Sequence, residues 1–137
     1  MEPLIAIVDD DKAVRDALQR MLRAHGFVAS VFASAERFLS STDAACASCL
    51  IADMRMPGMT GLDLHNHLMA NGVRVPTILI TARPTSTERR RAISVGIACY
   101  LAKPLGEQIL LDTVREALDN AGPIASASPT GQGSPRT

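Results

Sequence analysis

Short apolar runs alternate with helical patterns along most of this chain, and the alternation constrains the fold more than any other feature. The runs cover residues 4–8, 28–33, 49–52, 77–80 and 98–102. Runs this short suit buried strands better than helices. Between them, apolar residues such as Val14, Leu18 and Leu22 recur at helical spacing. Because apolar strands joined by helical crossovers form a parallel sheet covered on both faces, we predict a doubly wound, five-stranded α/β fold with three layers.

Capping residues and glycines set the expected limits of the helices. The first helix should end at Gly26, and a short second helix should begin after Ser34. Thr60 should open a third helix that stops near Asn71, and a fourth should cover about 87–95. The last helix carries apolar residues on one face: Leu110, Val114, Ala117 and Leu118.

The composition changes after Asn120, where Gly, Pro, Ser and Thr replace the large apolar residues. We therefore expect one domain over residues 1–120, followed by a flexible tail or linker over 121–137.

Charge and composition argue against several classes of protein. The formal net charge is zero and only 3% of the residues are aromatic, so we expect no direct contact with nucleic acid. The amino-terminal apolar run is too short for a signal peptide, and no run could span a bilayer. We therefore expect a cytoplasmic chain without membrane contact. Cys46 and Cys49 lack a second pair that would complete a zinc site, and we interpret them as small, partly buried thiols.

Polar side chains stand where the apolar runs end. Asp9 and Asp10 follow the first run, Asp53 the third, Thr81 the fourth and Lys103 the fifth. Ligands of open parallel sheets bind at the carboxyl edge of the strands, so these residues are the candidate site.

If the first and third strands are neighbours, Asp9, Asp10 and Asp53 converge and repel one another. A hard divalent cation such as Mg²⁺ would neutralise them and would also accept phosphate oxygens. Aspartate is a nucleophile in aspartyl-phosphate chemistry. Asp53 beside Mg²⁺, with Lys103 and Thr81 across the cleft, is thus suited to accept a phosphoryl group.

Four segments in order, IVDDDKAVRDAL, IADMRMPGMTGLDL, ILITA and CYLAKP, resemble the receiver domain of two-component response regulators. The triple aspartate and MRMPGMTG are most similar to the FixJ-type branch. The resemblance covers about residues 3–120 and implies a flavodoxin-like sheet with the strand order 2-1-3-4-5.

The resemblance also implies roles for the site residues. Asp53 would be the phosphoacceptor. The ligands of Mg²⁺ would be Asp10 directly, Asp9 through water, Asp53, and the backbone carbonyl of Arg55. Lys103 would pair with the phosphoryl group and Thr81 would donate a hydrogen bond to it. Tyr100 stands at the position of the family's switch aromatic, and the Lys103-Pro104 peptide bond is expected to be cis.

Other polar residues have simpler interpretations. Asp11 is read as the cap of the first helix. His65 and His67 are two positions apart, do not share a helix face, and are read as surface residues without a metal.

An arginine cluster follows the fourth strand: Arg83, Arg89, Arg90 and Arg91. It is either a solvated helix face with Glu88 as a partner, or a docking surface for another protein or a second receiver. FixJ-type chains usually have small residues where this one has Arg83, so Arg55 and Arg83 are expected to overlook the site and to gate access to it.

The resemblance implies a switch in which a sensor histidine kinase phosphorylates Asp53 and Tyr100 rotates inward. Such a chain takes part in its own phosphotransfer and dephosphorylation without being a conventional enzyme. The output is either that of a stand-alone receiver or that of the amino-terminal part of a transcriptional regulator. Two alternatives are a phosphorylation-independent interaction module with the same fold and a small phosphate-ester hydrolase.

Overall fold

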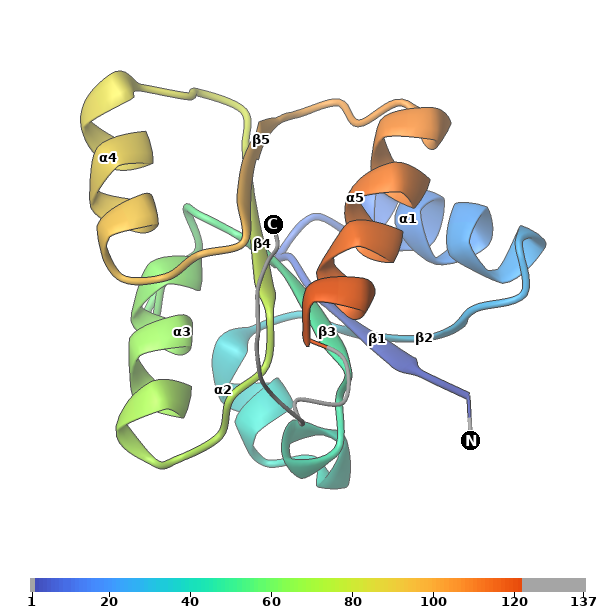
Figure 1. Ribbon diagram of the computed structural model, residues 1–137, viewed down its shortest axis with the longest axis horizontal. Coiled ribbons are helices and arrows are strands. Elements are labelled where there is room, and N and C mark those ends of the chain that lie inside the picture. Colours follow the sequence, from blue (N-terminus) through green and yellow to red (C-terminus); the bar gives the residue numbers. More distant parts are fainter. Residues whose placement is uncertain (1, 122–137) are drawn as a thin grey trace.

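The computed structural model describes residues 2–121 and contains the predicted alternation of strands and helices (Figure 1). The elements are β1 (Leu4–Val8), α1 (Lys12–Ala24), β2 (Val28–Phe32), α2 (Ala35–Leu39), a 3-10 helix (Thr42–Ala45), β3 (Cys49–Asp53), α3 (Gly61–Ala70), β4 (Thr77–Thr81), α4 (Ser86–Ser94), β5 (Cys99–Ala102) and α5 (Glu107–Ala121). The predicted limits agree to within about one residue for β2, α4 and β5. The 3-10 helix was not predicted. Apart from Ala121, the predicted tail lies outside the described residues.

The five strands form one parallel sheet in the order β2-β1-β3-β4-β5, which confirms the predicted topology. Helices α1 and α5 cover one face, and α2, α3 and α4 cover the other (Figure 1). All residues of β3 and β4 are buried, because the two strands lie inside the sheet with helices on both sides. No helix in the described part of the chain is long and apolar enough to cross a bilayer.

Side chains at the start of four helices fix where each helix begins. Asp11 caps α1 by accepting a hydrogen bond from the Ala13 N–H, as predicted. Ser34 and Thr85 cap α2 and α4 in the same way. Thr60 forms a reciprocal capping box with residue 63 at the start of α3. These caps end the loops that leave the carboxyl edge of the sheet, so they help to position the site.

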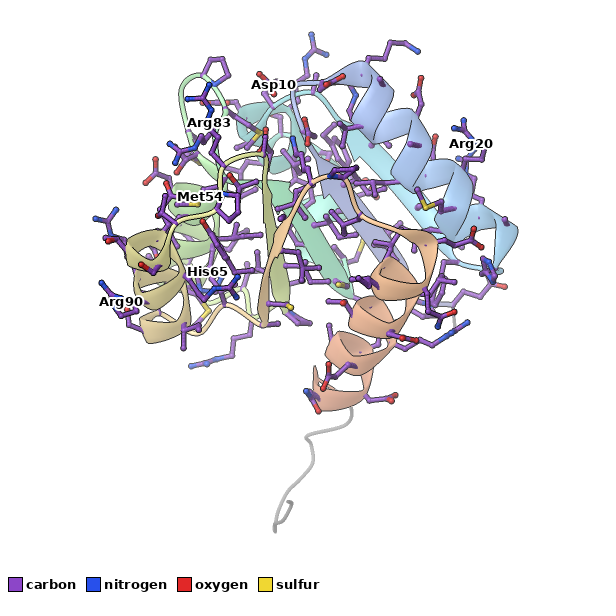
Figure 2. All side chains as sticks on the ribbon, turned by 90° about the horizontal axis from the view of Figure 1, so that it is seen from above. Asp10, Arg20, Met54, His65, Arg83 and Arg90 are labelled. Carbon is purple, nitrogen blue, oxygen red and sulfur yellow. The ribbon has the colours of Figure 1, made fainter. Side chains whose placement is uncertain are left out.

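The surface position predicted for His65 is wrong. Its side chain is only 4% exposed and lies between α3, β4 and the end of α4 (Figure 2). Its Nε2–H donates to the Val95 carbonyl over 2.9 Å, and Nδ1 lies 3.3 Å from the Thr77 hydroxyl. Burial is possible because both ring nitrogens find partners. His67 is exposed, as predicted.

The cysteines are free thiols in different environments. Cys46 is exposed and Cys49 is buried. Burial raises the pKa of the Cys49 thiol to about 12, so it is protonated and unreactive near neutral pH.

Candidate functional site

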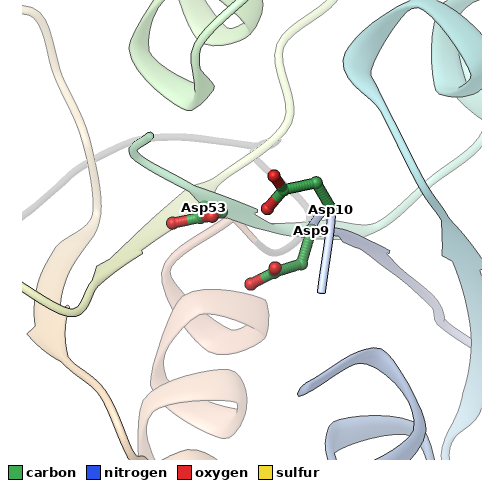
Figure 3. Close-up of side chains that lie close together, drawn as sticks. All are labelled: Asp9, Asp10 and Asp53. Atoms are coloured by element: carbon green, nitrogen blue, oxygen red, sulfur yellow. The ribbon is translucent and has the colours of Figure 1, made fainter. Parts of the chain in front are cut away.

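Three carboxylates meet at the carboxyl edge of the sheet. Asp53 is the last residue of β3, and Asp9 and Asp10 directly follow β1 (Figure 3). Strands β1 and β3 are neighbours, and Val8 is paired with Ala52. One carboxylate oxygen from each aspartate lies within 4.8 Å of the other two. The predicted convergence of the acids is therefore present.

Lys103 reaches the same cluster from the loop after β5. Its Nζ lies 2.9 Å from Asp9 Oδ2 and 3.4 Å from Asp53 Oδ1. The Lys103 N–H also donates to the carbonyl of Thr81 over 2.8 Å, which anchors the start of the loop to the end of β4. The Lys103-Pro104 bond is cis, as the resemblance implied.

Burial makes the charges of this cluster interact strongly. The Asp9 residue is 0% exposed and Asp53 is 4% exposed. Burial raises the pKa of the Asp53 carboxyl group, the charge of Asp9 raises it further, and Lys103 offsets only part of this. Burial would lower the pKa of Lys103, but contact with the two aspartates outweighs it and holds that pKa above its ordinary value. Lys103 is thus a firmly charged ammonium group.

One buried carboxylate oxygen of the cluster accepts no hydrogen bond. Asp9 Oδ1 accepts a hydrogen bond from the Asp11 N–H over 2.9 Å. Asp9 Oδ2 is buried and has no hydrogen-bond donor. Lys103 Nζ is close enough for an ion pair with this oxygen, but the direction of approach is not that of a hydrogen bond. A buried carboxylate oxygen that accepts no hydrogen bond and lies beside two further acids suits a hard cation, so the donor set fits Mg²⁺.

The turn after β3 holds Arg55, whose carbonyl the resemblance assigned to the metal. The Arg55 N–H donates to Asp53 Oδ1 over 3.3 Å, which fixes the carboxylate against the turn. The role of the Arg55 carbonyl stays a prediction.

Gly61 is a site residue that the sequence analysis missed. A Cβ atom at this position would lie 2.4 Å from the backbone oxygen of Asp53 and 2.9 Å from Leu79 Cδ2. Real atoms do not approach so closely, so only glycine lets α3 begin against the end of β3. The sequence did contain one signal, a glycine at the first position of a predicted helix. Glycine disfavours helices, so its presence there suggests a close contact that leaves no room for a side chain.

Thr81 ends β4 at the same edge and is completely buried. Its hydroxyl accepts a hydrogen bond from the Arg83 N–H over 3.1 Å. The Arg83 side chain is exposed near this edge of the molecule (Figure 2).

Tyr100 lies inward, with 2% of its surface exposed. Its hydroxyl donates to Glu88 Oε1 over 2.8 Å and accepts from the Thr85 N–H over 3.1 Å. The Arg89 guanidinium carbon lies 5.0 Å from the centre of the ring. The inward position is thus held by contacts with α4 and its cap.

Glu88 also has a partner that the sequence did not indicate. Arg55 Nη2 lies 2.6 Å from Glu88 Oε2, and the two residues are far apart in the chain. One of the two interpretations of the arginine cluster was a solvated face with Glu88 as a partner. The four arginines are exposed, as that interpretation expects, but the ion pair of Glu88 is made with Arg55, while Arg89 turns to Tyr100 and Arg90 faces outward (Figure 2).

Comparisons with known proteins give a consistent result. Residues 5–115 match the model of the response regulator receiver domain. The response regulator protein TodT of Pseudomonas putida is 36% identical over 126 residues, which are 92% of this chain and 56% of TodT. The chain therefore spans about half the length of curated relatives such as TodT and the response regulator protein TmoT.

Solved structures agree with the sequence matches. The response regulator StyR is 37% identical, with a TM-score of 0.79 over 88% of this chain and 61% of the StyR chain. The crystal structure of FixJ-N is 28% identical, with a TM-score of 0.79 over 87% of this chain and 95% of the FixJ-N chain.

Proposed function

Because the chain belongs to the response regulator receiver family, we propose that it is a phosphorylation-dependent signalling switch whose phosphoacceptor is Asp53. One observation carries this proposal. Asp53 ends a fully buried strand with a charged lysine 3.4 Å from one carboxylate oxygen and two further aspartates beside it.

In the proposed reaction a carboxylate oxygen of Asp53 attacks phosphorus, and the bond to the donor group breaks as the new O–P bond forms. The donor is the phosphohistidine of a sensor histidine kinase. Asp9, Asp10, Asp53 and the carbonyl of Arg55 would hold Mg²⁺, which supplies charge neutralisation for the phosphoryl oxygens. Lys103 adds a positive charge on the opposite side, and the Thr81 hydroxyl donates a hydrogen bond to the product.

The proposed output of the switch is a change in the shape of one partner-binding surface of the domain. A phosphoryl group adds about −1.5 to −2 charges at one point, which biases an equilibrium between two shapes. Thr81 and Tyr100 are the residues that we expect to follow this change, on the face formed by α4, β5 and α5. The reader of that face is a second receiver or another protein.

The chain's place in a longer protein is part of the proposal. We propose that residues 1–120 act as the receiver domain in the cytoplasm and that 121–137 serve as a tail or as a linker to an output domain. The greater length of the curated relatives supports the linker.

The test is intact mass spectrometry after incubation with acetyl phosphate and Mg²⁺. We expect the parent chain to gain one phosphoryl group and Asp53→Asn to gain none. Asp119→Asn is the matched control, because Asp119 is exposed at the far end of α5. It should be phosphorylated like the parent.

Two outcomes would contradict the proposal. One is a gain of mass by Asp53→Asn. The other is no gain by the parent although calorimetry shows that Mg²⁺ binds, which would favour a phosphorylation-independent interaction module.

A further inference from the structure

Helices α3 and α4 both begin with a threonine cap followed three residues later by an acid, but the two caps close differently. At α3 the Thr60 N–H donates directly to Asp63 Oδ2 over 3.2 Å. At α4 the Glu88 N–H donates to Thr85 Oγ1 over 3.1 Å, which is the first half of a capping box. The return half, from the Thr85 N–H to Glu88, is not made directly.

The hydroxyl of Tyr100 fills that gap. It accepts from the Thr85 N–H over 3.1 Å and donates to Glu88 Oε1 over 2.8 Å. The ring of a β5 residue therefore completes the cap of α4. If the ring left, the Thr85 N–H and the Glu88 carboxylate would both lose a partner, so the ring and the start of the helix are coupled.

The other oxygen of the same carboxylate is bound to Arg55. Nη2 of Arg55 lies 2.6 Å from Glu88 Oε2, and the Arg55 N–H contacts Asp53. The Glu88 side chain is 16% exposed and the Arg55 side chain is 52% exposed. A largely buried carboxylate is stabilised by a counter-charge, so Arg55 favours the position in which Glu88 receives the tyrosine hydroxyl.

We propose that Glu88 is the positioning residue that joins three elements: the turn after the phosphoacceptor, the cap of α4, and Tyr100. Through Arg55, it biases the chain toward the shape with the tyrosine inward. The link to signalling rests on the proposed function, because the inward shape is then the one that phosphorylation of Asp53 also favours. Arg55 and Glu88 thereby set how much of the signalling shape exists before any phosphoryl group arrives.

The chain offers a direct probe, because Tyr100 is its only tyrosine and it has no tryptophan. All tyrosine emission therefore comes from this ring, and quenching by acrylamide measures how far it is exposed. We expect Arg55→Gln and Glu88→Gln to raise the ratio of outward to inward ring. A rise of about 1.5- to 5-fold corresponds to the usual strength of a partly exposed ion pair.

Two further variants separate this role from a general effect on structure. Arg55→Lys keeps the charge and should retain most of the protection from quenching. Arg90→Gln removes the same charge from the outer face of α4 (Figure 2) and should leave quenching unchanged. The hydrogen bond of the Arg55 side chain is to Glu88, and the hydroxyl of Tyr100 is bound by Glu88 and Thr85, so a change in Arg55→Gln reports transmission through Glu88. Equal quenching in Arg55→Gln and Arg90→Gln would overturn the proposal.

A second measurement, after acetyl phosphate and Mg²⁺, tests the link to Asp53. The gain of mass is recorded on the same samples. If the variants are phosphorylated, the difference in quenching between the parent chain and Arg55→Gln should shrink, because the phosphoryl group then favours the inward ring by itself. An unchanged difference at full phosphorylation would overturn the link. If no sample gains mass, the proposed function fails, and the first measurement still decides the role of Glu88.

Discussion

Two buried polar clusters lie at opposite ends of the sheet, and they differ in whether the chain satisfies them. At the carboxyl edge, Asp9 and Asp53 are buried side by side, and Asp9 Oδ2 has no hydrogen-bond donor. Near the start of β4, His65 is equally buried, but both of its ring nitrogens have partners.

The difference distinguishes the cluster that we propose to bind a ligand from a histidine whose contacts hold the fold together. His65 ties α3 to the carbonyl that ends α4, so its hydrogen bonds belong to the fold. Asp9 Oδ2 has an ion-pair contact with Lys103 but accepts no hydrogen bond, so a bound cation would add a contact that the fold leaves unmade. Removing the hydrogen-bonding groups of His65 should therefore destabilise the protein, and removing a charge from the acidic cluster should stabilise it.

The largest effect should come from forcing the acidic cluster apart through the backbone. Gly61→Ala places a methyl group against the Asp53 carbonyl, so we expect the free energy of unfolding to fall by about 3 kcal/mol. Phosphorylation by acetyl phosphate should fall with it. Gly106→Ala is the matched control, because a Cβ atom there meets nothing within 4 Å. Urea denaturation measures both, and equal stabilities would show that α3 can shift without strain.

Removing the hydrogen bonds of His65 should have the next largest effect on the free energy of unfolding. His65→Phe keeps a ring of similar size but leaves the Val95 carbonyl without its donor, so we expect a loss of about 2 kcal/mol. Phosphorylation of Asp53 should be unchanged, because the cluster lies at the other end of β4. The same substitution at the exposed His67 should change stability by less than about 0.5 kcal/mol. A loss of phosphorylation in His65→Phe would show that the two clusters are not independent.

Removing one negative charge from the acidic cluster should have a smaller effect, and it should raise the free energy of unfolding. Two unit charges about 4 Å apart repel by about 4 kcal/mol at an effective dielectric constant of 20, and Lys103 offsets part of this repulsion. We therefore expect Asp53→Asn to raise the free energy of unfolding without Mg²⁺ by on the order of 1 kcal/mol. Mg²⁺ should then raise the denaturation midpoint of the parent more than that of the variant. A variant less stable than the parent would contradict the repulsion.

The smallest effect should appear in the dependence of stability on pH. The pKa of Asp53 is raised above its ordinary value of 3.8, so the folded chain keeps this proton to a higher pH than the unfolded chain does. Between the two values the unfolded state binds fewer protons, and the free energy of unfolding falls as pH rises. The Asp53 contribution cannot exceed about 1.4 kcal/mol per pH unit. Comparing the parent with Asp53→Asn isolates it, and identical profiles would show that Asp53 titrates normally.

The sequence predicted what depends on strand ends and missed what depends on contacts between distant segments. Asp9, Asp10, Asp53 and Lys103 could be placed together because parallel strands end at a common edge. Asp11 could be identified as a cap because capping is local. His65 was misplaced because its spacing from His67 says nothing about which of the two faces inward.

Glu88 and Gly61 show the same limit. An acid on a helix with many arginines suggests a partner on that helix, but the partner came from the turn after β3. The close approach of α3 to the Asp53 carbonyl is set by how the helix packs, and a glycine in a turn-rich segment has many simpler explanations. Both contacts join residues whose proximity only the assembled sheet determines.

The register of β3 between β1 and β4 limits which insertions and deletions this sequence can tolerate. The five residues of β3 are all buried, Leu50, Ile51 and Ala52 are paired on both sides, and Asp53 lies opposite Ile80 of β4. Deleting one residue would draw the carboxylate back by about 3.3 Å and turn it to the other face of the sheet. Single-residue substitutions near Asp53 keep its carboxylate at the same place in the sheet, whereas an insertion or deletion within β3 would move it. Insertions and deletions that survive should fall in the connections at the opposite edge, such as that between the 3-10 helix and β3.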